Sequence, residues 1–261
     1  MRRWVANLCT AILFAAGVCV MPIAAMAASA HIAVAANFTD AATEIAAAFT
    51  ETTGHQAILS YGATGQFYAQ IAQGAPFDIL LAADAERPAR LVDAGNGVPG
   101  TAFTYAIGQL VLYSTDPKLV NGSDTLLVHG ANTLEGTGFR KLAMANPDTA
   151  PYGRAAVQVM DALGVFAQLK PKIVQGQNIG QAYQFVHTGN AELGFVAAGQ
   201  VAHRNDGSRW VVPQELYDPI RQDAVLLARG QNNPAATAFL DFLKGDVAGD
   251  IIRKYGYAHP E

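Results

Sequence analysis

The feature that most constrains the fold is a regular alternation of short apolar runs and helical runs after residue 30. His31–Ala35 has the composition of a short buried strand, and apolar residues then recur at helical spacing from Phe38 to Phe49. Two further strand-like runs, 56–61 and 77–82, are each followed by a helix-like segment. This βαβαβ order predicts a parallel sheet covered by helices on both faces.

A second series of the same kind follows a longer β-like run, Tyr105–Tyr113. It alternates predicted strands and helices at 141–145, 155–163, 172–174, 180–187 and 193–197, with a loop predicted at 146–153. Another β-like run, 220–228, precedes two final helices at 234–243 and 247–255. Two such units joined by two long β segments indicate an α/β protein of two lobes, each a mostly parallel sheet flanked by helices. We expect residues 31–107 plus 222–261 in lobe 1, residues 108–221 in lobe 2, and a ligand cleft between them.

Composition excludes several classes of protein. With 51% hydrophobic and 15% charged residues, the chain is not of the disordered type. A net charge of -4 and the lack of basic runs argue against a nucleic-acid partner. The two cysteines, Cys9 and Cys19, both lie in the first 30 residues, so neither a disulfide framework nor a cysteine-built zinc site is expected downstream.

Residues 1–30 have the pattern of a secretory signal peptide. Arg2 and Arg3 precede an apolar run, and small residues follow, which allows cleavage after Ala27 or Ala30. The alternative, a membrane anchor, is less favoured because the run is shorter than the ~20 residues of a spanning helix. Loss of the two arginines leaves a mature net charge of about -6. A cysteine-free exported protein fits the bacterial periplasm.

Enzyme signatures are weak. The sequence contains no GxSxG, no GxxxxGK[ST] and no HExxH, and its six histidines are scattered. The carboxylates Asp78, Asp84 and Glu86 are explained by the start of a strand and the N-terminus of a helix. We therefore predict that the protein is not an enzyme and has neither a catalytic residue nor a bound metal cofactor.

Four junctions place small or polar residues between a strand and a helix: 35–38, 62–65, 151–154 and 177–180. Helix N-termini carry unpaired N–H groups and a partial positive charge, so they favour anions. Taken alone, each junction is explained better by ordinary helix capping than by ligand binding, with Asn37 as the expected N-cap of its helix.

Longer segments around these junctions carry a family resemblance. They are VAANFTDAATEIAAAF (34–49), SYGATGQFYAQIAQGAPFDILLAAD (60–84), NPDTAPYGRAAVQVMDALG (146–164), QNIGQAYQFVHTGNAELGFVAAGQV (177–201) and FLDFLKGDVAGDIIRKYGY (239–257). In this order they resemble the periplasmic molybdate-binding components of ABC transporters, which are type II two-lobed solute-binding proteins. The resemblance implies capture of molybdate, and of tungstate, for delivery to a transmembrane permease by a monomer with no cofactor.

The resemblance also implies the ligand positions. The oxyanion ligands of the family fall on Asn37, Thr64, Tyr152 and Ile179, with additional backbone contacts from Ala36 and Ala63. Molybdenum would be present only as the bound oxyanion. Some relatives have a donor tyrosine where this chain has Ala197, and our hypothesis is that the Tyr152 hydroxyl replaces it.

The chemistry of the implied positions suits a fully deprotonated dianion. None of the four is acidic, and a hydrogen phosphate would need an acceptor for its proton. Arg154, next to Tyr152, either assists binding or is a solvated residue in the first helical turn. Three alternatives remain: a binding protein for another tetrahedral oxyanion such as sulfate, an enzyme acting on a small anionic substrate in the cleft, and an exported sensor that signals by closing.

Overall fold

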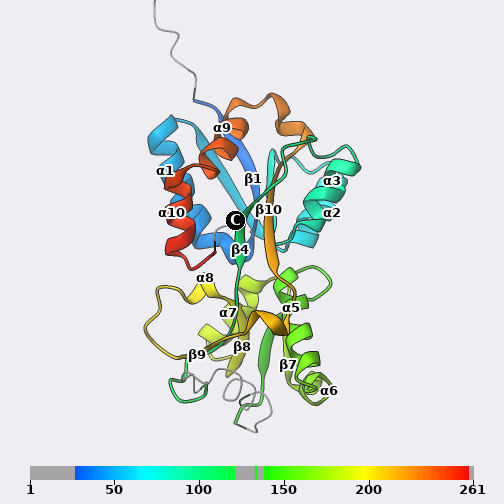
Figure 1. Cartoon of the computed structure of the whole chain (residues 1–261), viewed down its shortest axis with the longest axis vertical. Coiled ribbons are helices and arrows are strands. Elements are labelled where there is room, and N and C mark those ends of the chain that lie inside the picture. Colours follow the sequence, from blue (N-terminus) through cyan, green and yellow to red (C-terminus); the bar gives the residue numbers. More distant parts are fainter. Residues whose placement is uncertain (1–26, 121–132, 134–137, 259–261) are drawn as a thin grey trace, which may run out of the picture.

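The computed structural model describes residues 27–120, 133 and 138–258, and these build two five-stranded sheets. We call the two sheets with their helices the first and second lobes (Figure 1). The first sheet has the order β2-β1-β3-β10-β4, from β1 Ser29–Ala35, β2 Gln56–Gly62, β3 Ile79–Leu81, β4 Phe103–Gly108 and β10 Ile220–Leu226. The second has the order β7-β6-β8-β5-β9, from β5 Leu110–Ser114, β6 Leu142–Ala145, β7 Ile173–Gly176, β8 Leu193–Ala197 and β9 Ser208–Val211. The first 26 residues of the expected signal peptide lie outside the described part.

Helices cover both faces of each sheet. The first lobe holds α1 Thr39–Thr53, α2 Thr64–Ala72, α3 Glu86–Asp93, α9 Pro234–Leu243 and α10 Asp246–Lys254. The second lobe holds α5 Pro151–Ala162, α6 Phe166–Leu169, α7 Ile179–His187 and α8 Ala198–Val201. In the first lobe α1, α9 and α10 bury one face of the sheet, while α2 and α3 bury the other. None of the helices in the described ranges is long and apolar enough to cross a membrane.

Both sheets are mixed rather than mostly parallel. In the first sheet β1 pairs in parallel with β2 and β3, but β10 runs antiparallel to β3 and β4. In the second sheet β6 pairs in parallel with β7 and β8, but β5 runs antiparallel to β8 and β9. The reversed strands are β5 and β10. Each follows a crossing between the lobes and enters its sheet at the junction, whereas β4 and β9 run in the same direction as the βαβ strands.

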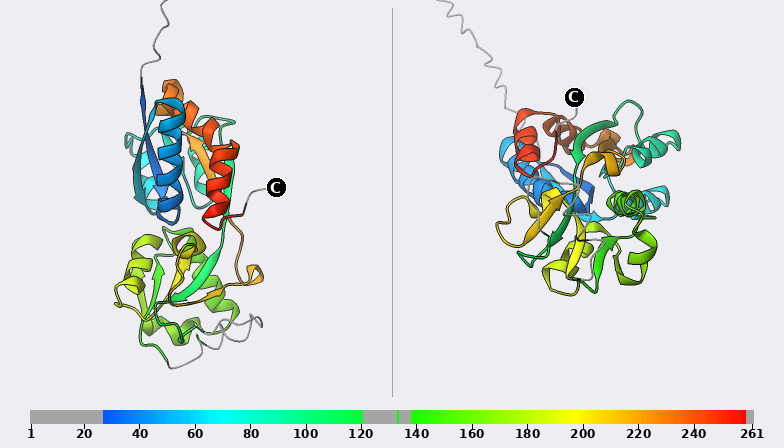
Figure 2. Two further views of the ribbon diagram at one scale, coloured as in Figure 1. Left: turned by 90° about the vertical axis from the view of Figure 1, so that its left-hand side faces the viewer. Right: turned by 60° about the horizontal axis from the view of Figure 1, so that its bottom comes forward.

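The chain crosses between the lobes twice. We expected one continuous β run from Tyr105 to Tyr113, but it is two strands in different sheets, separated only by Gln109. The return crossing leads from β9 to β10. Figures 1 and 2 show the two crossings running close together between the lobes.

Some element boundaries differ from those expected. Helix α5 begins at Pro151, not at residue 155, because a proline is well suited to the first position of a helix, where no N–H is needed. The short elements β9, α6 and α8 were not predicted at all. By contrast, the apolar periodicity and the caps of α9 and α7 are clear. The bounds of α9 are therefore as expected, and α7 begins only one residue before its expected start.

Asp78 joins the start of β3 to the C-terminal part of the first lobe. Its side chain is almost fully buried, and it accepts hydrogen bonds from the His31 N–H at 2.8 Å and the Asn233 amide at 3.3 Å. Arg229 adds an ion pair of 3.0 Å to the other carboxylate oxygen. The carboxylate thus satisfies donors from β1 and from the segment before α9.

Replacing this carboxylate should destabilise the first lobe. We expect Asp78→Ala to lower the free energy of unfolding by about 2–4 kcal/mol, because the His31 N–H loses its acceptor, Arg229 loses its ion-pair partner and Asn233 keeps only its bond to the Ser29 carbonyl. Asp78→Asn, which retains one acceptor oxygen, should cost less. Urea unfolding of the three proteins measures this, and equal stabilities would contradict the assigned role.

Candidate functional site

The four implied ligand residues meet in one small cavity between the lobes. Asn37, Thr64, Tyr152 and Ile179 are all at least nine-tenths buried. The cavity has a volume of about 10 Å³ and is lined by Ala35, Ala36, Asn37, Gly62, Ala63, Thr64, Ala83, Ala150, Pro151, Tyr152, Asn178 and Ile179. None of these lining residues is acidic or basic.

Parallel strands explain why these residues converge. β1 and β2 of the first lobe and β6 and β7 of the second end at the junction between lobes, and a helical segment follows each of them. Thr64 is the first residue of α2, Tyr152 the second of α5 and Ile179 the first of α7. The first N–H groups of a helix have no partner within it. Three helix starts therefore present N–H groups to one enclosed space.

Thr64 is fixed by a neighbouring strand end. Its hydroxyl oxygen accepts a hydrogen bond from the Ala83 N–H at 2.9 Å, which leaves the hydroxyl hydrogen available for another acceptor. Ala63, the residue before it, already directs its N–H to the Gln66 side chain at 3.4 Å. The geometry thus makes Thr64 a double donor, through N–H and O–H.

Asn37 is not the helix N-cap that its position suggested. It lies in a 3-10 turn, Ala36–Phe38, and α1 begins only at Thr39 without a side-chain cap. Its Nδ2 donates instead to Gln222 Oε1 at 2.6 Å and to Tyr257 Oη at 3.3 Å. The Tyr257 hydroxyl in turn donates to the Asn37 backbone carbonyl at 2.6 Å. Sequence reasoning missed Gln222 and Tyr257, because no local pattern relates residues about 200 positions apart.

The Tyr152 hydroxyl reaches the first crossing. A Cβ added at Gly108 would overlap this hydroxyl, so the absence of a side chain at Gly108 makes room for the tyrosine. Burial raises the pKa of Tyr152 well above its usual value and Tyr257, Tyr105 and Tyr217 raise it further, while the Asn37 side chain lowers it. The hydroxyl is therefore a neutral donor. Ala197, at the end of β8, is fully buried and offers no side-chain donor.

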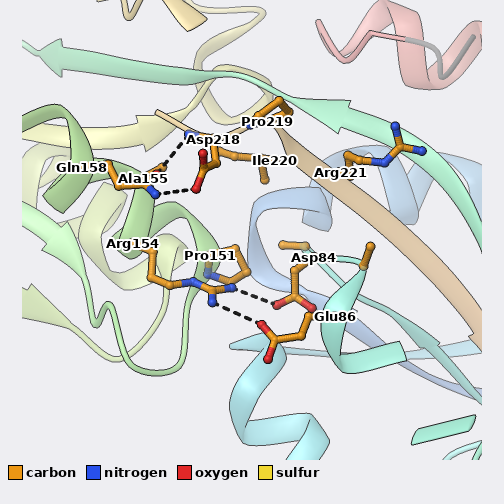
Figure 3. Close-up of a pocket in the computed structure, with 12 residues that line it drawn as sticks. Asp84, Glu86, Pro151, Arg154, Ala155, Gln158, Asp218, Pro219, Ile220 and Arg221 are labelled. Carbon is orange, nitrogen blue, oxygen red and sulfur yellow. Dashed lines mark hydrogen bonds and ion pairs between the residues drawn. The ribbon is translucent and has the colours of Figure 1, made fainter. Parts of the chain in front are cut away.

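Charged side chains lie beside the cavity rather than in it. An adjoining pocket of about 300 Å³ shares Ala83 and Pro151 with the cavity (Figure 3). There Arg154 of the second lobe pairs with Glu86 at 3.4 Å and with Asp84 at 3.6 Å, both from the first lobe. The hydrogen bond from Arg154 lowers the pKa of Glu86. Arg154 is thus not among the residues that line the cavity, and it is more than a solvated side chain because its ion pairs link the two lobes.

Other contacts also hold the lobes together around the cavity. The Gly65 N–H donates to the Thr149 carbonyl at 2.9 Å, and Arg87 donates to the Asp148 carbonyl at 3.1 Å. A Cβ added at Gly65 would lie 2.9 Å from the Thr149 Cα, closer than packed carbon atoms approach. The structure is therefore a closed arrangement of the two lobes that depends on a glycine at position 65.

The structure also bears on two other kinds of site, a metal site and a dinucleotide-binding loop. The described residues contain no group of three or more His, Cys, Asp or Glu side chains that could hold a metal ion. Residues 95–100 have the GxGxxG spacing of dinucleotide-binding loops, but they follow helix α3 and precede strand β4. A dinucleotide loop would connect a strand to a following helix, so this match has no functional context.

Comparison with known proteins identifies the class. Residues 30–258 match the family described as bacterial extracellular solute-binding proteins. The chain belongs to this family. It is a binding protein rather than an enzyme, so the alternative of an enzyme acting in the cleft is ruled out. The family match, together with the two sheets and their helices, confirms the expected two-lobed fold class.

The named relatives narrow the class further. The chain is 54% identical over 225 residues to the molybdate-binding protein ModA of Rhodobacter capsulatus, covering 86% of each protein. It is 49% identical to the molybdate-binding protein ModA of Azotobacter vinelandii, covering 94% of this chain and 96% of that protein. The solved periplasmic molybdate-binding protein of Azotobacter vinelandii superposes with a TM-score of 0.84 at 38% identity, covering 89% of this chain and 100% of that one. The family resemblance seen in the sequence is confirmed.

Proposed function

We propose that this protein captures molybdate, and tungstate, and delivers it to the permease of an ABC transporter. The observation that carries the proposal is the convergence of three helix starts and Asn37 on one cavity without a charged lining residue. The names of the relatives support molybdate as the ligand.

The proposed ligands are Asn37, Thr64, Tyr152 and Ile179. Thr64 donates through its N–H and hydroxyl, Tyr152 and Ile179 through their backbone N–H groups, and Asn37 through its N–H and side-chain amide. Ala36 and Ala63 are secondary contacts, the latter weakened by its bond to Gln66. Hydrogen bonds to a charged group contribute about 1.5–3 kcal/mol each, so several together offset the cost of burying a dianion.

Binding must be coupled to lobe movement. A cavity of about 10 Å³ has room for about one water molecule, so a tetrahedral oxyanion would enter only with a slight separation of the lobes. We propose lobes that exchange at Gln109 and just before Ile220. These points lie within two residues of the boundaries expected from the sequence, 107/108 and 221/222, because β4 ends at Gly108 and β10 begins at Ile220 in the first sheet. A ligand that touches both lobes favours their closure, and a permease would recognise the closed monomer in the periplasm.

Calorimetric titration tests the ligand directly. We expect tight binding of molybdate and tungstate at one site per chain, and no measurable binding of sulfate or phosphate. The longer Mo–O and W–O bonds let one oxyanion reach donors on both lobes, while hydrogen phosphate would bring a proton to a site built from donors. Tighter binding of sulfate than of molybdate would overturn the proposal in favour of a sulfate-binding protein.

Gly65→Ala should weaken molybdate binding without weakening the fold. The added Cβ would meet the Thr149 backbone and prevent full closure, and we expect the dissociation constant to rise about tenfold or more, as for loss of one charge-assisted hydrogen bond. Thermal unfolding without ligand should be unchanged or slightly improved, because alanine is favoured over glycine in a helix.

Gly249→Ala is the matched control, since this α10 position meets only the flexible Arg253 side chain, at 3.4 Å. Its molybdate affinity should equal that of the wild type. An unchanged affinity for Gly65→Ala would show that binding does not use the closed contact.

We further propose that export is followed by cleavage after Ala27 rather than Ala30. Ala30 is fully buried in β1 and pairs with Ala57, and Ala28 bonds to the next strand through the Gln56 N–H at 2.9 Å. Cleavage after Ala30 would remove these strand residues.

N-terminal sequencing of the protein exported by a Gram-negative host should therefore find Ala28 as the first residue. A chain that begins at His31 should unfold at a lower urea concentration than one that begins at Ala28. A mature N-terminus at His31, or equal stability of the two chains, would contradict this cleavage site.

A further inference from the structure

Three buried polar atoms without a hydrogen-bond partner belong to residues at the junction of the lobes. They are Asn37 Oδ1, Gln222 Nε2 and Tyr152 Oη. Asn37 and Gln222 are joined by the bond from Nδ2 to Oε1. The other two atoms flank Gly108, because a Cβ there would overlap Tyr152 Oη and lie 3.0 Å from Gln222 Nε2. Unpartnered buried polar atoms are costly, so three in one cluster call for an explanation.

The amide orientations explain all three together. Asn37 donates away from the cavity to Gln222, which leaves its carbonyl oxygen as the remaining polar atom of a cavity-lining side chain. Gln222 accepts the bond from Asn37 through Oε1. The Gln222 atom left near the Tyr152 hydroxyl is therefore Nε2, which can only donate. Rotating both amides by half a turn exchanges N and O at each residue. Gln222 would then donate to Asn37, Asn37 would give up its 3.3 Å bond to Tyr257 Oη and have a free N–H₂ group, and Gln222 Oε1 could accept from Tyr152.

We propose that Gln222 is a positioning residue that, together with the Tyr152 hydroxyl, turns the Asn37 amide so that Nδ2 donates to the bound oxyanion. This rests on the proposed function, and it assigns the Tyr152 hydroxyl to Gln222 instead of the anion. Tyr152 then touches the anion only through its backbone N–H, so the donor absent at Ala197 is not replaced by this hydroxyl.

Gln222 is held where this role requires it. It is fully buried on β10, and the register between β10 and β4 shifts between Gln222 and Asp223, where Tyr105 is the additional residue of the bulge. Such bulges re-aim side chains next to functional sites. The Tyr105 hydroxyl donates to the Ala82 carbonyl at 3.0 Å and lies 3.4 Å from Gln222 Oε1, so its oxygen could accept from Nε2 after the rotation.

The orientation also bears on specificity. With Nδ2 toward the cavity, Asn37 offers a donor, which suits a fully deprotonated dianion. With Oδ1 toward the cavity it would offer an acceptor, which suits the proton of hydrogen phosphate. Gln222 would thus select proton-free oxyanions from a position outside the cavity lining.

A double-mutant cycle tests whether Gln222 acts through Asn37. Molybdate affinity is measured by calorimetry for the wild type, Gln222→Met, Asn37→Ala and the double variant, with thermal unfolding as the folding control. We expect Gln222→Met to raise the dissociation constant about tenfold in the wild type, the loss of one hydrogen bond to a charged ligand. In the Asn37→Ala background it should have no further effect. If Gln222→Met does not fold, the isosteric Gln222→Glu, which can only accept when ionised, replaces it in the same cycle.

The Tyr152 hydroxyl is tested in parallel. Tyr152→Phe should weaken binding in the wild type but not in the Gln222→Met or Gln222→Glu background, whereas a hydroxyl that contacts the anion directly would weaken it in both. If the Gln222 variant changes molybdate affinity equally with and without the Asn37 side chain, or does not change it, the positioning role is overturned. The proposed function would be unaffected by that result. Absence of molybdate binding by the wild type would overturn the proposed function and this proposal with it.

Discussion

The proposed site depends on leaving the first N–H groups of several helical segments free for a ligand while shielding them from water. A buried N–H without an acceptor is unfavourable, and this cost is tolerable only where a ligand supplies the acceptor. The strand ends bring these groups to one place. Small residues there, such as Ala36 and Ala63, let the backbones approach, and the contact of Gly65 with Thr149 closes the space from one side.

The electrostatics of the junction follow from the same constraint. Arg154, Asp84 and Glu86 carry their charges next to the cavity, where they pair with each other across the lobes. Asp84 is further neutralised by Arg87. A positively charged side chain inside the cavity would attract an anionic ligand in the open protein as well as in the closed one. In the proposed function, neutral donors from both lobes would contribute fully only after closure, and this would allow a chain of net negative charge to bind a dianion.

Much of the fold could be predicted from the sequence, and the exceptions have physical causes. Strongly periodic elements such as α9 were clear, because apolar spacing and caps agree. The Tyr105–Tyr113 run was expected to cross between the lobes, but its division into two strands at Gln109 could not be seen, since strands in two sheets look alike when both are buried. The parallel strands were visible as βαβ units, but the antiparallel partners come from distant segments whose pairing leaves no local signal.

The candidate site, like the fold, could be predicted only in part. The positions Asn37, Thr64, Tyr152 and Ile179 could be proposed because motifs around each junction resemble a family, and the structure brings all four to one cavity. The side-chain partners could not be predicted. Gln222 and Asn37 are 185 residues apart, and the bond between them exists only because β10 lies in the same sheet as β1.

The position of β10 between β3 and β4 sets an order of assembly for a chain that emerges N-terminus first. All strands of the second sheet lie between residues 110 and 211, so that sheet can be completed while the C-terminal segment is still being delivered. β4 has no place in the first sheet until residues 220–226 arrive to pair on both sides. The lobe that begins first is thus finished last, and until then its half-built sheet has an unpaired β3 edge.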